Sequence, residues 1–291
     1  MREAGHEVRA LSTTGRGSAS EIAKCCLDQG ADLVLVAGGD GTINEVVNGM
    51  VFSQVPLGIL PGGTANVLAM ETSIGKQMVV AAGQLGNWIP ERVSVAVHKD
   101  GNERPDRYFL LMCGAGLDAH IVYSIRDSVK AVLGKASYWV GGFSQLGRPF
   151  PEFDVEVEGQ RYRTSFALAS RVRNYGGDLE IARNVTLMDD HFELVLFSGS
   201  SSFRYLRYMA GVVTGKLEQI PGVTILQTSG VRLFAPDDQR IYSQVDGEYA
   251  GPLPASLEIV PRSLTLLLPQ AYRTRRKASD FQQEWTTSHT P

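Results

Sequence analysis

Hydrophobic and polar residues follow one pattern over roughly the first ninety positions of the chain. Residues 31–37 and 56–60 are almost entirely apolar, which is typical of parallel strands covered on both faces. Apolar side chains recur three and four positions apart, as in helices, in residues 18–30, 42–52 and 64–72. A further strand is predicted over residues 6–13. This alternation of strand and helix predicts a parallel sheet with helices on both sides.

After about residue 90 the pattern changes to short alternating runs separated by turn residues. Strands are predicted over residues 92–101, 107–114, 153–170, 191–199, 230–237 and 240–248, with a last pair of strands over 255–269. Two helical stretches, 128–146 and 202–214, interrupt them. This block predicts an antiparallel sandwich or barrel. The chain thus divides into an α/β domain (1–91), a mainly β sandwich domain (92–270) and a polar tail (271–291) with a short basic run.

Composition narrows the class of protein. With 43% hydrophobic and 20% charged residues, the 291-residue chain is typical of a globular protein. Its net charge of −3 argues against nucleic acid as a partner. Cys25, Cys26 and Cys113 form neither a disulfide framework nor a metal motif, which favours a reducing compartment. The sequence contains no apolar run of about 18 residues and no secretory signal, so we expect a cytoplasmic protein, with peripheral membrane contact as an open option.

A glycine-rich turn follows the strand 31–37, with the sequence Gly38-Gly39-Asp40-Gly41-Thr42. Such a turn between a parallel strand and a helix presents backbone N–H groups that suit phosphate oxygens. Asp40 cannot contact phosphate directly because like charges repel. It suits a divalent cation, a water network or the proton of an attacking hydroxyl. The alternative is a tight turn in which Asp40 caps a helix.

A second turn repeats this arrangement after the strand 56–60. Pro61-Gly62-Gly63-Thr64 leads through Asn66 into another helix. Neighbouring parallel strands would bring both turns to the same crevice, which indicates a bound nucleotide. Neither turn matches GxxxxGK[ST] or GxGxxG, so the two commonest nucleotide-binding loops are absent.

These motifs resemble those of a known family. Residues 37–50 (AGGDGTINEVVNGM) and 56–69 (PLGILPGGTANVLA) are similar to the catalytic domain of bacterial diacylglycerol kinases and sphingosine kinase-like lipid kinases. The resemblance continues in order through residues 114–122, 173–194 and 245–248 (VDGE). It implies a Rossmann-like first domain, a β-sandwich second domain and a cleft between them where ATP meets a diacylglycerol-like lipid.

The resemblance also implies roles for individual residues. Glu248 would be the general base that takes the proton of the lipid hydroxyl, and Asp40 would anchor a Mg²⁺–water network. A structural Mg²⁺ would lie at the Asp189 carboxylate, with backbone carbonyls of Thr186 and His191. Residues that would contact the nucleotide are Thr13, Gly38, Gly39, Asp40, Gly41, Thr42, Ile43, Asn44, Glu45, Gly63, Thr64 and Asn66. Taken alone, Glu248 is also compatible with an exposed hairpin acid, and Asp189 with an ordinary loop acid.

Other expectations are less specific. Asp118 and His120 are candidates for contact with a lipid headgroup, and Tyr138, Trp139 and Phe143 for an acyl groove or for core packing. The family usually has one more strand, loop and helix before residue 6, so we expect a poorly covered sheet edge near residues 33–37. Two other functions stay open: an NAD kinase, whose family shares the GGDGT motif, and a catalytically impaired nucleotide-binding regulator.

Overall fold

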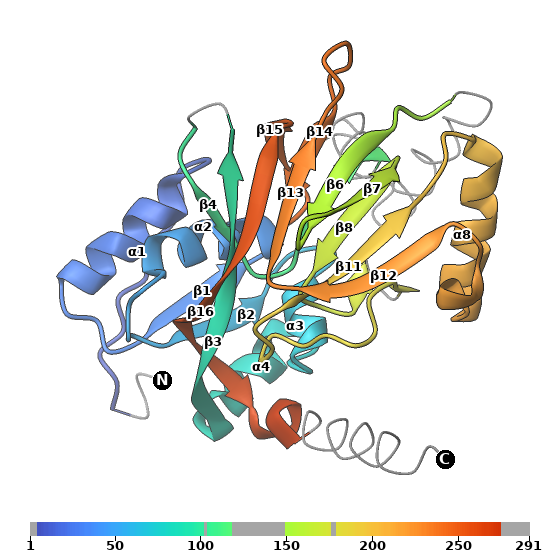
Figure 1. Ribbon diagram of the computed structural model, residues 1–291. Coiled ribbons are helices and arrows are strands. Elements are labelled where there is room, and N and C mark those ends of the chain that lie inside the picture. Colours follow the sequence, from blue (N-terminus) through green and yellow to red (C-terminus); the bar gives the residue numbers. More distant parts are fainter. Residues whose placement is uncertain (1–4, 102–103, 118–148, 176–178, 275–291) are drawn as a thin grey trace.

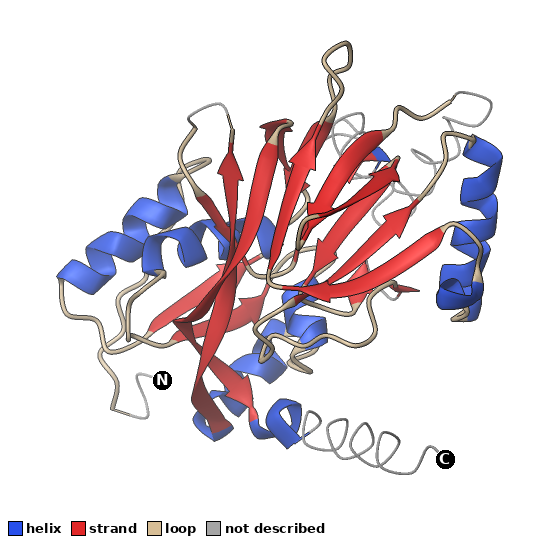
Figure 2. Cartoon of the chain, in the orientation of Figure 1, coloured by secondary structure: helices blue, strands red, loops and turns tan. Residues whose placement is uncertain are grey.

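The structure is a computed structural model, which describes residues 5–101, 104–117, 149–175 and 179–274 (Figures 1 and 2). Its first part contains α1 (Ser18–Asp28), β1 (Val34–Gly38), α2 (Asp40–Met50), β2 (Leu57–Pro61), α3 (Val67–Glu71), α4 (Met78–Gln84) and a 3₁₀ turn, η2 (Leu85–Asn87). Strands β1 and β2 are parallel, as the apolar runs predict. Helix α2 packs on β1 and α4 packs on β2. Helices α1 and α2 cross closely, because a Cβ at Gly49 would lie only 2.4 Å from the carbonyl oxygen of Ser20.

One mixed sheet of eight strands runs through both halves of the chain. It contains β1, β2, β3 (Trp88–Asp100), β4 (Arg107–Phe109), β6 (Phe153–Val157), β7 (Gln160–Thr164), β13 (Gly230–Phe234) and β16 (Ala255–Pro269). Its order is β1-β2-β16-β13-β6-β7, and β3 pairs with both β16 and β4. Strand β16 joins the halves, since its Leu266 pairs with Leu57 of β2 and its first residues pair with β13. The predicted domain boundary at residue 91 therefore falls inside a continuous strand, β3.

A second, six-stranded sheet is antiparallel and faces the first. Its order is β12-β11-β8-β5-β14-β15. The strands are β5 (Met112–Gly116), β8 (Phe166–Ser170), β11 (Phe192–Phe197), β12 (Val223–Thr228), β14 (Tyr242–Val245) and β15 (Glu248–Pro252). A two-stranded ribbon, β9 (Asn174–Tyr175) with β10 (Leu179–Glu180), helix α8 (Ser202–Thr214) and the 3₁₀ turn η3 (Leu217–Gln219) complete the described elements.

Apolar side chains fill the space between the two sheets. Phe109, Phe153 and Phe192 are fully buried in this layer, and the rings of Phe109 and Phe192 stack with centroids 6.1 Å apart. A second core cluster lies around β1, β2, α2 and the end of β16. The predicted fold class, an α/β domain followed by a β sandwich, is confirmed.

The structure corrects several strand predictions. The run 107–114 contains two strands, β4 and β5, and the run 153–170 contains three, β6, β7 and β8. Residues 6–14 form no regular structure, because a strand requires a hydrogen-bonded neighbour and none of the described strands lies beside them. Strand β1 consequently forms an edge of the described sheet, and its Ala37 is exposed, as expected for residues 33–37. The predicted pair of strands over 255–269 is one long strand, β16, whose pairing with β3 is interrupted between Val260 and Leu264.

Several predictions concern residues outside the described ranges. These are the helix over 128–146, the last part of the tail, and the lipid-contact candidates Asp118, His120, Tyr138, Trp139 and Phe143. Helix α8 coincides with the prediction for 202–214.

Candidate active site

The two glycine turns lie against each other at the carboxyl ends of β1 and β2. The parallel register pairs Gly38 with Pro61, and the N–H of Gly62 donates to the carbonyl of Gly38 over 2.9 Å. A Cβ at Gly63 would lie 2.5 Å from the Cα of Gly39. The prediction that both turns share one edge of the sheet is therefore correct.

Close packing explains why these positions are glycine. None of Gly38, Gly39, Gly41, Gly62 and Gly63 has a positive φ, so backbone conformation does not require glycine here. Any larger residue at 39 or 63 would push the two backbones apart. Gly62 and Gly63 are exposed, and so is the Thr64 side chain beside them. The paired turns thus form a compact surface at the start of α2, where the first N–H groups of the helix lack an intrahelical partner and suit the oxygens of a phosphate chain.

The carboxylate of Asp40 binds the second turn to the first. Its Oδ2 accepts a hydrogen bond from the N–H of Val67 over 3.0 Å, and its Oδ1 accepts one from the N–H of Leu68 over 3.2 Å. Burial raises the pKa of Asp40, and these N–H donors oppose that rise. Asp40 therefore caps α3, the helix after the second turn. This differs from both sequence interpretations, a metal–water anchor and a cap on the helix that Asp40 itself begins.

Asn66 shapes the second turn in the same way. Its Oδ1 accepts from the N–H of Gly63, and its Nδ2 donates to the carbonyl of Gly63, both over 2.8 Å. The side chain of Thr42 packs over Gly38, and Ile43 is buried in the core. Ile43 could therefore contact a nucleotide only through its backbone. The side-chain amide of Asn66 already forms hydrogen bonds within the turn.

Glu45 points away from the turns toward the start of α1. Its Oε1 accepts from the N–H of Gly17 over 2.7 Å and its Oε2 from the N–H of Ala19 over 3.1 Å. This carboxylate satisfies the free N–H groups at the helix start and lies at the positive end of the helix dipole. Its predicted contact with the nucleotide is not what the side chain does in this structure. Thr13 is exposed in the segment that leads into α1.

Asn44 connects the first domain to the β sandwich. Its Nδ2 donates to Oδ2 of Asp246 over 2.9 Å and to the carbonyl of Tyr108 over 3.0 Å. Asp246 also accepts from the backbone N–H groups of three consecutive residues, Leu110, Leu111 and Met112. Burial raises the pKa of Asp246 to about 6 despite these donors. The Asn44 side chain is thus an interdomain link, whereas the sequence predicted a phosphate contact.

Glu248 lies at the start of β15 and reaches the first glycine turn from the sandwich side. Its Oε2 accepts from Nη2 of Arg107 over 2.9 Å and from Nη2 of Arg16 over 3.0 Å. Its Oε1 lies 3.0 Å from the position that a Cβ on Gly41 would occupy. The side chain is 30% exposed. A carboxylate from the second domain therefore lies beside the glycine turn of the first, and the roles predicted for Asp40 and Glu248 stay predictions.

The loop that the sequence predicted as a structural Mg²⁺ site is held together by the protein's own groups. Oδ2 of Asp189 accepts from both the N–H and the hydroxyl of Thr186, and the carbonyl of Thr186 accepts from the N–H of Asp189. The guanidinium of Arg171, which is fully buried, donates to the carbonyls of Ser94, Leu187 and Asp189. Burial lowers its pKa to about 10, so it stays charged at neutral pH.

Two of the three groups predicted to hold Mg²⁺, the carboxylate of Asp189 and the carbonyl of Thr186, already accept hydrogen bonds within the loop. The buried guanidinium of Arg171 lies beside the loop, and the carboxylates of Asp189 and Asp190 balance its charge. Within the described residues, no group of three or more His, Cys, Asp or Glu side chains could hold a metal ion. Nε2 of His191 is buried without a hydrogen-bond partner, but the prediction for His191 concerned its carbonyl.

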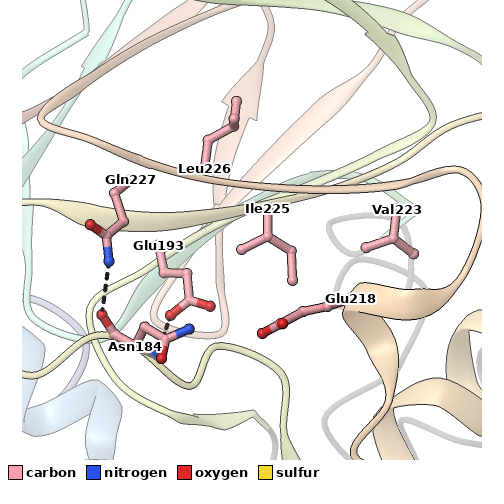
Figure 3. A pocket seen from close by; sticks show the side chains of 7 residues that line it. All are labelled: Asn184, Glu193, Glu218, Val223, Ile225, Leu226 and Gln227. Carbon is pink, nitrogen blue, oxygen red and sulfur yellow. Dashed lines mark hydrogen bonds between the residues drawn. The ribbon is translucent and has the colours of Figure 1, made fainter. Parts of the chain in front are cut away.

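A separate surface pocket of about 380 Å³ lies at β12 (Figure 3). The carboxylates of Glu193 and Glu218 face each other across it, and burial raises the pKa of Glu193. Strand β12 is at the edge of the six-stranded sheet opposite to β15, which carries Glu248. The pocket is therefore no part of the candidate active site.

Sequence reasoning missed the basic and linking residues of the site. Arg107 and Arg171 belong to no glycine or acidic motif, and Arg16 stands between Gly15 and Gly17, outside the two predicted turns; the partners of Arg16 and Arg107 are distant in sequence. Asp246 was visible as the first acid of VDGE, but no sequence signal showed that it is buried.

Comparison with protein families agrees with this architecture. Residues 1–97 match the model of the diacylglycerol kinase catalytic domain, and residues 112–268 match that of the YegS C-terminal NAD kinase beta sandwich-like domain. The chain belongs to the family that combines these two domains, a diacylglycerol kinase catalytic domain followed by a YegS C-terminal NAD kinase beta sandwich-like domain, which covers more than half of the chain. The matches support a phosphotransferase of the lipid-kinase type at the level of the family.

Relatives of this family match nearly the full chain. A diacylglycerol kinase of Bacillus subtilis (strain 168) is 27% identical over 276 residues, which cover 93% of this chain and 88% of the relative. One of Staphylococcus haemolyticus is 24% identical, covering 98% and 85%. The crystal structure of a diacylglycerol kinase from Bacillus anthracis superposes with a TM-score of 0.71 at 21% identity, covering 90% and 85%. At that identity, the structure supports the shared fold alone.

Among the described residues, no helix is both long and apolar enough to cross a membrane.

Proposed function

We propose that the protein transfers the γ-phosphoryl group of ATP, bound as its Mg²⁺ complex, to a free hydroxyl of diacylglycerol or a related lipid. The single observation that carries this proposal is the position of Glu248. A partly exposed carboxylate of the sandwich domain lies directly against the glycine turn at Gly41. A phosphate chain on the turns and a hydroxyl beside Glu248 would therefore meet in one place.

The paired turns would hold the phosphates. Phosphoryl transfer requires mainly positioning and charge neutralisation rather than covalent help from the protein. The N–H groups of Gly62 and Gly63 are already bonded within the turns, so the hydroxyl of Thr64 would be the donor on one side and the backbone of Gly39 to Thr42 would supply the donors on the other. Asp40 would act indirectly, by fixing the two turns to each other.

Glu248 would act as general base. The lipid hydroxyl oxygen forms a bond to the γ-phosphorus, the bond from that phosphorus to the bridging oxygen of ADP breaks, and the hydroxyl proton goes to Glu248. Arg16 and Arg107 would orient the carboxylate through Oε2 and leave Oε1 for the proton. They also place positive charge where negative charge gathers in the reaction.

Labelled ATP distinguishes the candidate functions. The protein is incubated with [γ-³²P]ATP, Mg²⁺ and one acceptor at a time: diacylglycerol, sphingosine or NAD. The proposal expects label in the lipid. Label in NAD would favour an NAD kinase, which shares the GGDGT motif, and ATP binding without transfer would favour a nucleotide-binding regulator.

A further inference from the structure

Helix α8 has apolar side chains on two opposite faces, and only one of these faces is buried against the rest of the protein. Tyr205, Tyr208 and Val212 are buried, and both tyrosine rings contact the ring of Phe197, with centroids 5.8 and 4.6 Å apart. This face fixes the helix to the sandwich beside β11, at the side of the molecule shown at the right of Figure 1. The helix therefore cannot turn its other face inward.

The opposite face of α8 is apolar as well and faces solvent. The exposed fractions are 68% for Phe203, 42% for Leu206 and 62% for Val213. With the exposed Ala210, these residues stand three, seven and ten positions apart from Phe203, which places them in one stripe along the helix. A solvent-exposed stripe that begins with phenylalanine indicates a surface for a partner.

Both charged residues of α8 itself are positive. Arg204 and Arg207 are exposed, and α8 contains no acidic residue. In the part of the chain that the structure describes, neither arginine forms a side-chain hydrogen bond or an ion pair. The nearest acid along the chain is Glu218 in η3, whose carboxylate points into the pocket toward Glu193 (Figure 3). The face thus combines apolar side chains with unpaired cations.

We propose that α8 docks the protein on a bilayer that contains anionic phospholipids, with Phe203, Leu206 and Val213 in the interface and Arg204 and Arg207 on the lipid phosphates. Helices with one apolar face and a basic border lie in the interfacial plane in this way. The inference rests on the proposed function in one respect: a kinase with a membrane lipid as substrate must reach the membrane.

A second copy of the chain is a poorer occupant of this face. In a twofold contact between two α8 helices, Arg204 and Arg207 of both copies would approach each other without an acid on either helix. Helix α4 also exposes apolar side chains, with Val79 exposed by 85%, but unlike α8 it contains no basic residue.

Vesicle flotation tests the proposal with the full chain, without ATP or diacylglycerol. Vesicles are made of phosphatidylcholine alone or of phosphatidylcholine and phosphatidylglycerol at a ratio of about 3:1. We expect the wild type to float with the anionic vesicles and less so in high salt. The double variants Phe203→Ser/Val213→Ser and Arg204→Gln/Arg207→Gln should each lower partitioning about tenfold. Val79→Ser, the matched control on α4, should bind like the wild type.

The outcomes separate cleanly. Equal binding of the wild type and both double variants, or an equal loss with Val79→Ser, would overturn the proposal. So would a variant that changes oligomeric state by light scattering and leaves flotation unchanged, since the face would then be a contact between copies. Thermal unfolding checks that the variants are folded.

Activity toward lipid in detergent micelles separates this inference from the proposed function. The α8 variants should keep the wild-type rate in micelles and lose rate on anionic vesicles. A wild type that floats but transfers no phosphate would refute the kinase proposal alone.

Discussion

Arg107 lies between the two domains, with its Nη2 2.9 Å from Oε2 of Glu248 and 3.2 Å from Oδ1 of Asn44. One guanidinium nitrogen therefore contacts both the proposed base and the helix that follows the first glycine turn. Arg16 contacts the same carboxylate oxygen, but its side chain is 74% exposed, whereas that of Arg107 is 22% exposed.

We expect Arg107→Ala to lower kcat by at least about tenfold and to change KM for ATP little, because the arginine orients Glu248 rather than holding the nucleotide. Arg107→Lys should recover part of the rate. Arg16→Ala is the matched control and should have the smaller effect. Steady-state kinetics in detergent micelles measure this, and a pure KM effect of Arg107→Ala would contradict the positioning role.

Gly63→Ala should separate the two glycine turns. The new methyl group would lie 2.5 Å from the Cα of Gly39, so the backbones must move, at a cost of about 1–3 kcal/mol. ATP affinity should fall with stability, as measured by urea unfolding and calorimetric titration. Gly83→Ala in α4 has no neighbour within 4 Å and should leave both unchanged or slightly improve stability. An unchanged ATP affinity in folded Gly63→Ala would show that the paired turns do not bind the nucleotide.

Arg171→Met should destabilise the protein strongly. It removes the donors to two buried carbonyls and one partly buried carbonyl, which costs on the order of 3 kcal/mol. Arg163→Ala, which breaks an ion pair on the exposed surface, is the control and should cost less than about 1 kcal/mol. Both values come from urea unfolding at pH 7.

Because Arg171 supplies the positive charge of the loop 186–191, a chelator should not lower the melting temperature of the nucleotide-free wild type. A drop on adding EDTA that Mg²⁺ reverses would restore the predicted metal site at Thr186, Asp189 and His191.

Asp246 should make stability fall as the pH rises. Its pKa is about 6 in the folded protein and 3.8 in the unfolded chain. Its contribution to the free energy of unfolding is therefore complete below about pH 4 and is lost as the pH rises past 6. The loss amounts to about 3 kcal/mol. The free energy of unfolding of the wild type, relative to that of Asp246→Asn, should decline by this order between pH 4 and 7.5. A relative stability that increases over this range would mean that the four N–H donors outweigh burial.

Structural features that depend on elements adjacent in the sequence, such as the pairing of β1 with β2, were predicted correctly. Two apolar strands connected through a helix are expected to pair in parallel, and parallel neighbours bring their turns together, as Gly38 and Gly62 show. The strand predicted over residues 6–13 failed because a strand depends on a partner, which local alternation does not reveal.

Side-chain roles within the site were harder to predict, because their partners are remote. Asp40 caps a helix that starts 27 residues later, and Asn44 binds an acid 202 residues away. In the sequence, an acid such as Asp40 or an amide such as Asn44 looks like a ligand contact, because a motif shows the residue type and not its hydrogen-bond partner. Glu248 could be assigned only through the resemblance, and the structure adds its position at Gly41.

The most direct test of the account is phosphate transfer from ATP to diacylglycerol by the wild type and Glu248→Gln. The account predicts transfer by the wild type and a loss of about 10²- to 10⁴-fold in kcat for the variant, with ATP binding retained. Glu258→Gln, which changes a half-exposed glutamate paired with Lys99, is the matched control and should keep the wild-type rate. A near-wild-type rate for Glu248→Gln, or no transfer to any lipid by the wild type, would contradict it.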